Sequence, residues 1–178
     1  SSCGTGDDDY ETGQGNCNKT RTRAATAVAT WLEAEYPDTP VILLGDLNSY
    51  AKEDPITVLN DYGYSDAAAT VIGELAYSYT FDGQLGTLDY LMTNALASEW
   101  LFDATEWHIN ADKPAVLDYN TEDNGDLFTN SLLYRASDHD PVIATFTMPS
   151  ETMAGDWDSD GDIDMIDLQR LSMAITSN

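Results

Sequence analysis

The sequence predicts an α+β fold, and three observations favour this prediction. An alanine-rich amphipathic segment lies near the start, short β-rich runs flanked by glycines follow, and an alternating apolar run lies near residue 145. Helix and strand periodicities in turn along one chain are typical of layered α+β domains and argue against a helical bundle. The 178 residues suffice for one full domain, or for one domain plus a small module.

The first predicted helix covers residues 18–36 and ends before Pro37. Its apolar residues recur at helical spacing on one side, namely Ala25, Val28, Ala29 and Leu32. Residues 41–47 are mostly apolar and therefore predict a buried strand. We expect this strand to deliver Asp46 and Asn48 at its end.

A shorter helix is expected over residues 55–62. Asp54 precedes it as a candidate N-cap, because its carboxylate can accept the first free backbone N–H groups. Gly63 follows as its C-terminal stop, since glycine tolerates the left-handed conformation that ends many helices.

Strand patterns account for much of the remaining chain. The runs 76–83 and 86–94 are separated by Gln84-Leu85, and we predict that they pair as a hairpin. Residues 98–134 are irregular and acidic, so a loop is expected there. Alternation in residues 139–148 predicts a last strand.

Composition limits the possible partners and the compartment. The net charge is −25, with 32 acidic against seven basic residues, which excludes nucleic-acid binding through a broad basic surface. No apolar run approaches the ~20 residues of a membrane span. As a disulfide, Cys3 and Cys17 would close a small loop and indicate an extracellular, secreted protein. Two free thiols are the alternative, and a zinc site lacks further ligands nearby.

Three short motifs place polar groups at strand ends. They are GDLN at 45–48, TLDY at 87–90 and SDHDPV at 137–142. A charged side chain at the end of a buried strand must face a cleft, a partner or a metal, because isolated burial of a carboxylate is costly. Each motif alone is compatible with a structural aspartate, but three together favour a site.

These motifs resemble the endonuclease/exonuclease/phosphatase superfamily, whose fold is deoxyribonuclease I-like. The stretches GDLNSYAKEDPI, SYTFDGQLGTLDY, WHINAD and YRASDHDPV look like the C-terminal half of large secreted bacterial nucleases of that superfamily. The resemblance covers about residues 1–148. It implies that residues 1–149 form the C-terminal part of the two-sheet α/β sandwich of that fold.

The resemblance also assigns roles at a catalytic site. Asp46 matches the aspartate that orients or deprotonates the attacking water, and Asn48 the asparagine that holds the scissile phosphate. His139 matches the histidine that contacts the phosphate and takes part in proton transfer, and Asp89 the carboxylate that pairs with it. Asp138 matches a ligand of the catalytic Mg²⁺ or Mn²⁺.

Other residues receive different expectations. We expect a structural role for Asp140 before Pro141, and we leave His108 out of the catalytic set. Outside the site, three basic residues are the expected phosphate contacts: Arg21, Arg23 and Lys52.

The resemblance does not extend to the N-terminal half of the family's fold, which supplies further metal ligands and a second histidine. We therefore expect a C-terminal piece of a processed precursor, held against its N-terminal half or no longer catalytic. Without that half, part of the sandwich core would be exposed as an apolar patch.

The composition changes near residue 150, where we place a module boundary, giving a second segment over residues 150–178. Residues 156–167 follow the spacing of a calcium-binding EF-hand-like loop, with Gly161 at its sharp turn. The expected ligands are Asp156, Asp158, Asp160, Asp162, Asp164 and Asp167. Ile163 at position 8 and Asp167 at position 12 of the loop make this segment resemble a dockerin-like repeat. This resemblance implies a bound Ca²⁺ ion and leaves open a cohesin-like or self-assembly partner.

The sequence thus leaves two functions. The first is a secreted, metal-dependent nuclease that hydrolyses phosphodiesters of DNA or RNA. The second is an extracellular calcium-binding structural or assembly subunit built on a truncated, inactive nuclease fold.

Overall fold

The computed structural model describes Cys3, Asp7, residues 13–114, Leu117, residues 135–147 and residues 164–166. Contacts divide the chain into two compact units, Ser1–Phe146 and Thr147–Asn178. Among the described residues, no helix is both long and apolar enough to cross a membrane. In the second unit, Asp164 accepts a hydrogen bond from the backbone N–H of Ile166 at 2.6 Å. The other expected calcium ligands lie outside the described residues: Asp156, Asp158, Asp160, Asp162 and Asp167.

The first unit begins with α1 (Asn18–Glu35), which confirms the helix predicted from the alanine-rich segment. Ala29 and Leu32 are buried on its inner side, whereas Val28 is 39% exposed. The start of this helix has no side-chain cap from Cys17. Instead, the carboxylate of Asp7 accepts hydrogen bonds from the backbone N–H groups of Lys19 and Thr20.

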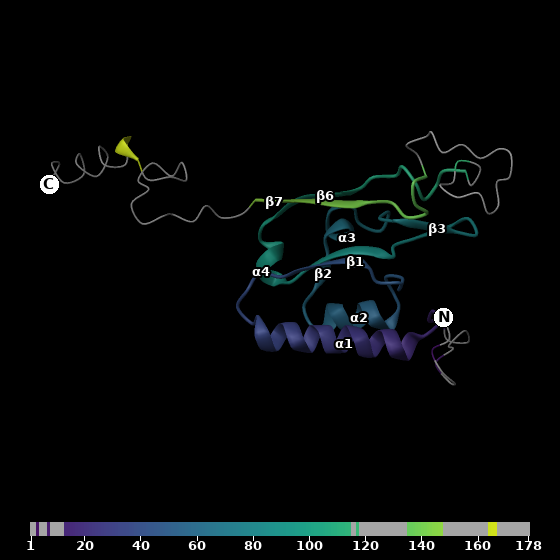
Figure 1. The fold of residues 1–178 in the computed structure, drawn as a ribbon, viewed down its shortest axis with the longest axis horizontal. Helices are drawn as coiled ribbons and strands as arrows, with labels where there is room; N and C mark the ends of the chain where they lie inside the picture. The colour runs from purple at the N-terminus through teal and green to yellow at the C-terminus, as the bar shows by residue number, and fades with distance from the viewer. Residues whose placement is uncertain are drawn as a thin grey trace. The chain divides into compact units, whose positions relative to one another are not determined.

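A three-stranded antiparallel sheet follows α1. Its strands are β1 (Ile42–Asp46), β5 (Asp89–Thr93) and β2 (Ser65–Asp66), in the spatial order β1-β5-β2. Figure 1 shows α1 and α2 (Asp54–Asp61) on one side of this sheet and the pair β6–β7 on the other. The core lies between the two helices and β5, where Leu32, Leu59, Tyr90 and Met92 pack together.

The expectation that β1 is buried is wrong for the described residues. Leu44 is 72% exposed and Ile42 is 39% exposed, although Leu43 packs against the core. The reason is the place of β1 at the edge of its sheet, with helices covering one face only. The apolar run of this strand therefore leaves side chains on its other face uncovered.

The second helix also differs in its cap. Glu53, not Asp54, occupies the N-cap position, because Asp54 is already the first residue of α2. The carboxylate of Asp54 accepts a hydrogen bond from the side-chain amide of Asn18 at 2.6 Å and so joins the two helices. Gly63 follows the helix with φ +85°, which confirms it as the stop signal.

Two short helices were not predicted. In α3 (Ala67–Ile72) the carboxylate of Asp66 accepts hydrogen bonds from the first backbone N–H groups, and in α4 (Ala95–Ser98) the side chain of Asn94 does the same. Both fit the preference of aspartate and asparagine for the N-cap.

The hairpin is shorter than expected and turns elsewhere. It consists of β3 (Tyr79–Phe81) and β4 (Gln84–Gly86), so the predicted turn residues Gln84-Leu85 lie inside a strand. The turn is Asp82-Gly83, with φ +48° and +74°. This dipeptide is a strong hairpin signal, because both turn positions need positive φ. The run 86–94 instead contributes β5, which pairs with β1.

The expected loop over 98–134 contains a strand at its start. This strand, β6 (Leu101–Glu106), pairs antiparallel with β7 (Val142–Phe146), and β7 confirms the predicted last strand. The apolar pattern of the sequence does not reveal β6, because one of its buried residues is the charged Glu106. The described residues thus form a mixed α and β arrangement with small sheets, in agreement with the α+β class.

Candidate active site

Strand register brings two aspartates together. Asp46 is the last residue of β1 and Asp89 the first of β5, and the antiparallel register places them directly opposite each other. His139 reaches the same place from the loop before β7, where its backbone forms an isolated bridge with Tyr79. One ligand atom from each of Asp46, Asp89 and His139 lies within 4.8 Å of the other two. Three segments distant in sequence therefore converge on one point.

Asp89 and His139 form a direct pair. Nδ1 of His139 lies 2.6 Å from Oδ2 of Asp89, and both side chains are 23% exposed. The hydroxyl of Ser78 donates to the same Oδ2 at 2.8 Å. Both contacts go to Oδ2, so among the described residues Oδ1 of Asp89 is left for a further ligand. In the part of the chain that the structure describes, Nε2 of His139 is likewise the ring nitrogen not used by this pair.

Asp46 and Asn48 act as one unit. The backbone N–H of Asn48 donates to Oδ1 of Asp46 at 2.7 Å, and its side-chain amide donates to Oδ2 at 3.0 Å. This requires a left-handed backbone at Asn48, with φ +48°, which asparagine tolerates better than most residues. Both side chains are thereby held at the tip of β1.

Asp138 does not belong to the three-residue group. Its negative charge acts on Tyr79 instead, where burial first and the charge of Asp138 second raise the pKa of the phenol. The ring of Tyr79 packs on the imidazole of His139, with centroids 4.7 Å apart. A metal-binding role for Asp138 stays a prediction.

A second histidine–aspartate pair lies beside the first. Nδ1 of His108 is 2.9 Å from Oδ2 of Asp140, and the ring of Tyr77 stacks on His108 at 4.0 Å. Oδ1 of Asp140 accepts the backbone N–H groups of Asn110 and Ala111 at 2.8 and 3.0 Å. Asp140 is only 2% exposed, so its carboxylate serves the fold around it.

Two residues near the site were missed by sequence reasoning. Ser78 is fully buried, and its hydroxyl also accepts the backbone N–H groups of Leu88 and Asp89. Asn110 donates from its side-chain amide to the carbonyl of His139 at 2.7 Å. A serine inside a β-rich run is no signal by itself, whereas Asn110 lies within the WHINAD stretch.

A cavity of about 760 Å³ adjoins Asn48. Its lining includes the aromatic side chains of Tyr50, Tyr79 and Phe81, together with the charged side chains of Arg21 and Glu53. The rings of Tyr79 and Phe81 are stacked with centroids 6.4 Å apart, and Phe81 is 59% exposed. A row of rings thus leads from His139 along the β3–β4 hairpin.

The geometry of the three-residue group fits a divalent cation. Carboxylate oxygens are ligands of Mg²⁺, and imidazole adds a donor that suits Mn²⁺ and related ions. Among the described residues, Asp46, Asp89 and His139 are the set of ligating side chains gathered in this way. Asp46 and Asp89 could hold such an ion, while His139 could exchange a proton with a bound molecule.

Comparison with known proteins gives a likeness in structure but none in sequence. No family model and no curated protein matches the sequence. Among solved structures, the chain resembles NExo, a 3′ phosphatase from Neisseria whose structure holds a product DNA hairpin, with a TM-score of 0.48 and 20% sequence identity. The match covers 73% of this chain, which spans about half (54%) of the length of that one.

Proposed function

We propose that this chain carries the site of a metal-dependent phosphodiesterase that hydrolyses DNA or RNA. The observation that carries the proposal is the convergence of Asp46, Asp89 and His139, from the end of β1, the start of β5 and the loop before β7. The resemblance of the motifs around these residues to the endonuclease/exonuclease/phosphatase superfamily supports the same reaction.

Each residue has a role that its contacts support. Asp46 orients the attacking water and takes up its proton as the new P–O bond forms. Asn48, fixed to Asp46, donates to a non-bridging phosphate oxygen. Nε2 of His139 contacts the phosphate and passes a proton to the leaving oxygen as the old P–O bond breaks, while Asp89 holds Nδ1.

A divalent ion would balance the negative charge of this site. Asp46 and Asp89 would hold Mg²⁺ or Mn²⁺, with Asp138 as a further ligand candidate. The bound ion would stabilise the negative charge that develops on the phosphate oxygens. The three aspartates repel an anionic substrate without such a cation, so activity should depend on it.

A net charge of −25 makes phosphate contacts weak as a source of affinity. Stacking on aromatic rings needs no positive charge and contributes about 1–3 kcal/mol per base. The exposed ring of Phe81, stacked on Tyr79 beside His139, supports this mode of binding. We infer that unpaired bases next to the scissile phosphate lie against these rings.

Further proposals concern the rest of the molecule. Apolar side chains of β1, β6 and β7 are exposed, including Leu44, Phe102 at 75% and Ile143 at 45%. This supports a covering segment, which we take to be the N-terminal half of the same precursor.

The Cys3–Cys17 disulfide is present, confirming that prediction, and is compatible with secretion. The calcium loop at 156–167 and its cohesin-like or self-assembly partner rest on sequence pattern alone.

The proposal is tested with the purified chain, alone and with the upstream half, on single-stranded and plasmid DNA with Mg²⁺ or Mn²⁺. We expect cleavage that chelation abolishes and that Asp46→Ala lowers by about 10²-fold or more. Asp61→Ala, an exposed aspartate at the end of α2, is the matched control and should keep full activity. Absence of cleavage in every assembly would favour the calcium-binding scaffold instead.

A further inference from the structure

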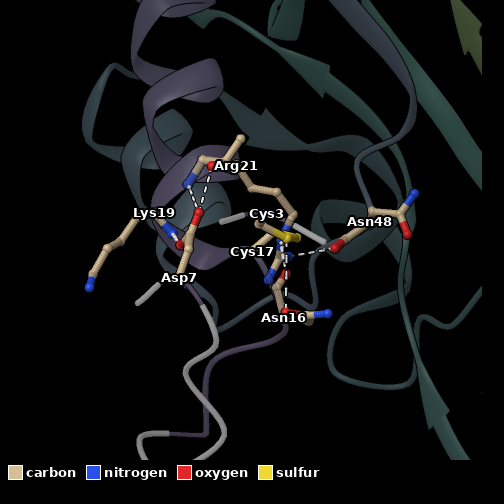
Figure 2. The surroundings of a disulfide bond; sticks show 8 residues. Cys3, Asp7, Asn16, Cys17, Lys19, Arg21 and Asn48 are labelled. Atoms are coloured by element: carbon tan, nitrogen blue, oxygen red, sulfur yellow. Dashed lines mark hydrogen bonds between the residues drawn. A yellow bond between two sulfur atoms is a disulfide. The ribbon is translucent and has the colours of Figure 1, made fainter. Parts of the chain in front are cut away.

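Arg21 belongs to α1 and contacts two loops: the N-terminal loop, at Asn16, and the active-site loop after β1, at Asn48 and Ser49. Its Nη1 donates to the backbone carbonyl of Asn48 and to the hydroxyl of Ser49. The same nitrogen pairs with the carboxylate of Glu53 at 2.6 Å. The side chains of Arg21 and Glu53 are 16% and 7% exposed, so the pair is largely shielded from solvent. Figure 2 shows Arg21 and Asn48 together beside the disulfide.

The loop that receives Arg21 is the one that carries the catalytic unit. Asn48 has φ +48°, a conformation that costs free energy and needs support from its surroundings. The hydroxyl of Tyr90 donates to the carbonyl of Ser49 at 2.8 Å and fixes the loop from the core side. Arg21 fixes the preceding carbonyl, that of Asn48. The two contacts together hold the turn that points Asn48 at Asp46.

Arg21 is itself held from the N-terminal loop. Its Nε donates to the carbonyl of Asn16 at 2.9 Å, and the next residue, Cys17, is joined to Cys3 by the disulfide. Gly15 packs against the ion pair so closely that a Cβ there would lie 2.6 Å from Nη2 of Arg21 and 2.9 Å from Oε2 of Glu53. The orientation of the guanidinium is therefore fixed from three sides.

We propose that Arg21 is a positioning residue for Asn48 and, through it, for Asp46. This replaces the expectation that Arg21 contacts substrate phosphate, because its Nη1 and Nε are engaged by Asn48, Ser49, Glu53 and Asn16, and its Nη2 is buried without a hydrogen-bond partner among the described residues. The kinetic part of this inference rests on the proposed function, whereas the structural part does not. Glu35, the exposed last residue of α1, serves as the matched control.

The test compares Arg21→Gln/Glu53→Gln with Glu35→Gln in the full chain. The double variant is used because Arg21→Gln alone would leave the Glu53 carboxylate buried without its partner. Gly15→Ala is the second perturbation, which displaces the pair without removing a charge. Amide hydrogen exchange at Asn48 reports the loop conformation without requiring activity, and kcat and KM are measured in parallel.

We expect faster exchange at Asn48 in the double variant and in Gly15→Ala, with exchange in the core of β5 unchanged. The expected kinetic effect is a tenfold to hundredfold loss of kcat with KM nearly constant, about the range that misplaced catalytic groups produce. Glu35→Gln should leave both exchange at Asn48 and the kinetic constants unchanged. Unaltered exchange at Asn48 overturns the proposal, and so does a raised KM with normal kcat and a smaller salt dependence, which is the result for a phosphate contact.

The two hypotheses fail in different ways. If the wild-type chain hydrolyses no phosphodiester in any assembly, the proposed function is wrong, while the exchange data still decide the role of Arg21. If the wild type is active and the variants lose neither protection nor kcat, the positioning role alone is wrong.

Discussion

The molecule contains two histidine–aspartate pairs of similar geometry, and their surroundings differ. In the pair of His139 and Asp89, both side chains are 23% exposed and a second carboxylate, Asp46, lies within reach. In the pair of His108 and Asp140, the carboxylate is fully buried and also accepts two backbone N–H groups. The first pair has capacity left for a substrate or an ion, whereas the acceptor capacity of the second is used by the fold.

Three consecutive residues, Tyr77, Ser78 and Tyr79, contact the two pairs. Tyr77 stacks on His108 and Tyr79 packs on His139. Between them, the carbonyl of Ser78 accepts the backbone N–H of Asp140, and its hydroxyl donates to Asp89. Hydrogen-bond saturation and exposure of the carboxylate, rather than the pairing itself, therefore separate the pair that we propose as catalytic from the structural pair.

The largest expected effect comes from removing each histidine in turn. His139→Ala should lower phosphodiester hydrolysis by about 10²–10⁴-fold, the usual contribution of a general acid or base, and change stability little. His108→Ala should keep activity within severalfold but lower the free energy of unfolding by about 1–3 kcal/mol, because it leaves a buried acceptor unsatisfied. Initial rates and chemical denaturation measure the two effects.

A reversal of these effects would contradict the comparison. If His108→Ala abolished hydrolysis in a chain with native near-UV circular dichroism and an unchanged unfolding midpoint, His108 would belong to the catalytic machinery. Rescue of His139→Ala by added imidazole would further support proton transfer at this position.

A smaller effect is expected from Ser78→Ala, which acts on the segment between the pairs. Loss of the hydroxyl leaves the backbone N–H groups of Leu88 and Asp89 without their acceptor and should lower stability by about 1–3 kcal/mol. Because Asp89 also loses a donor, we expect kcat to fall by about tenfold.

Ser98→Ala is the control for that substitution. The hydroxyl of Ser98 bonds to Thr93 and Asn94 at α4, and no contact joins it to Asp46, Asp89 or His139 among the described residues. It should lower stability to a comparable degree and leave kcat unchanged. Equal kinetic losses in both serine variants would mean that Ser78 acts through stability alone.

The smallest effect concerns pH and Glu106, which lies beside the structural pair. Burial raises the pKa of the Glu106 carboxyl, and the N–H of Tyr77, donating to Oε2 at 2.6 Å, opposes this only in part. A raised pKa means that the folded state binds the proton more tightly, so this group's contribution to stability falls as pH rises from 4.5 through the folded pKa.

Glu106→Gln removes this titration. Its free energy of unfolding should therefore decrease less between pH 4.5 and 7 than that of the wild type. Thermal unfolding at a series of pH values measures the difference, and Glu99→Gln, on a residue that is exposed after α4, is the control. Identical pH slopes in wild type and Glu106→Gln would show that burial of Glu106 does not perturb its ionisation.

Several elements follow from local sequence because local physics decides them. The first helix has a continuous run of helix-forming residues, and Gly63 supplies a conformation that few other residues adopt. The turn at Asp82-Gly83 was predictable by the same reasoning, although the apolar pattern suggested a longer hairpin. By contrast, β6 shows no clear apolar alternation, because one of its buried residues, Glu106, is charged. Its burial is compensated by the backbone N–H of Tyr77, which comes from another segment and could not be predicted locally.

The sequence alone identified Asp46, Asn48, Asp89 and His139 as polar residues at strand ends, because a charge beside an apolar run needs a cleft, a partner or an ion. Only the tertiary structure decided that Asp46 faces Asp89 across the sheet, that Asp140 pairs with His108, and that Arg21 holds Asn48. The physical reason is that strand register and contacts between distant segments depend on how the whole unit packs, and no local pattern of residue types encodes those distances.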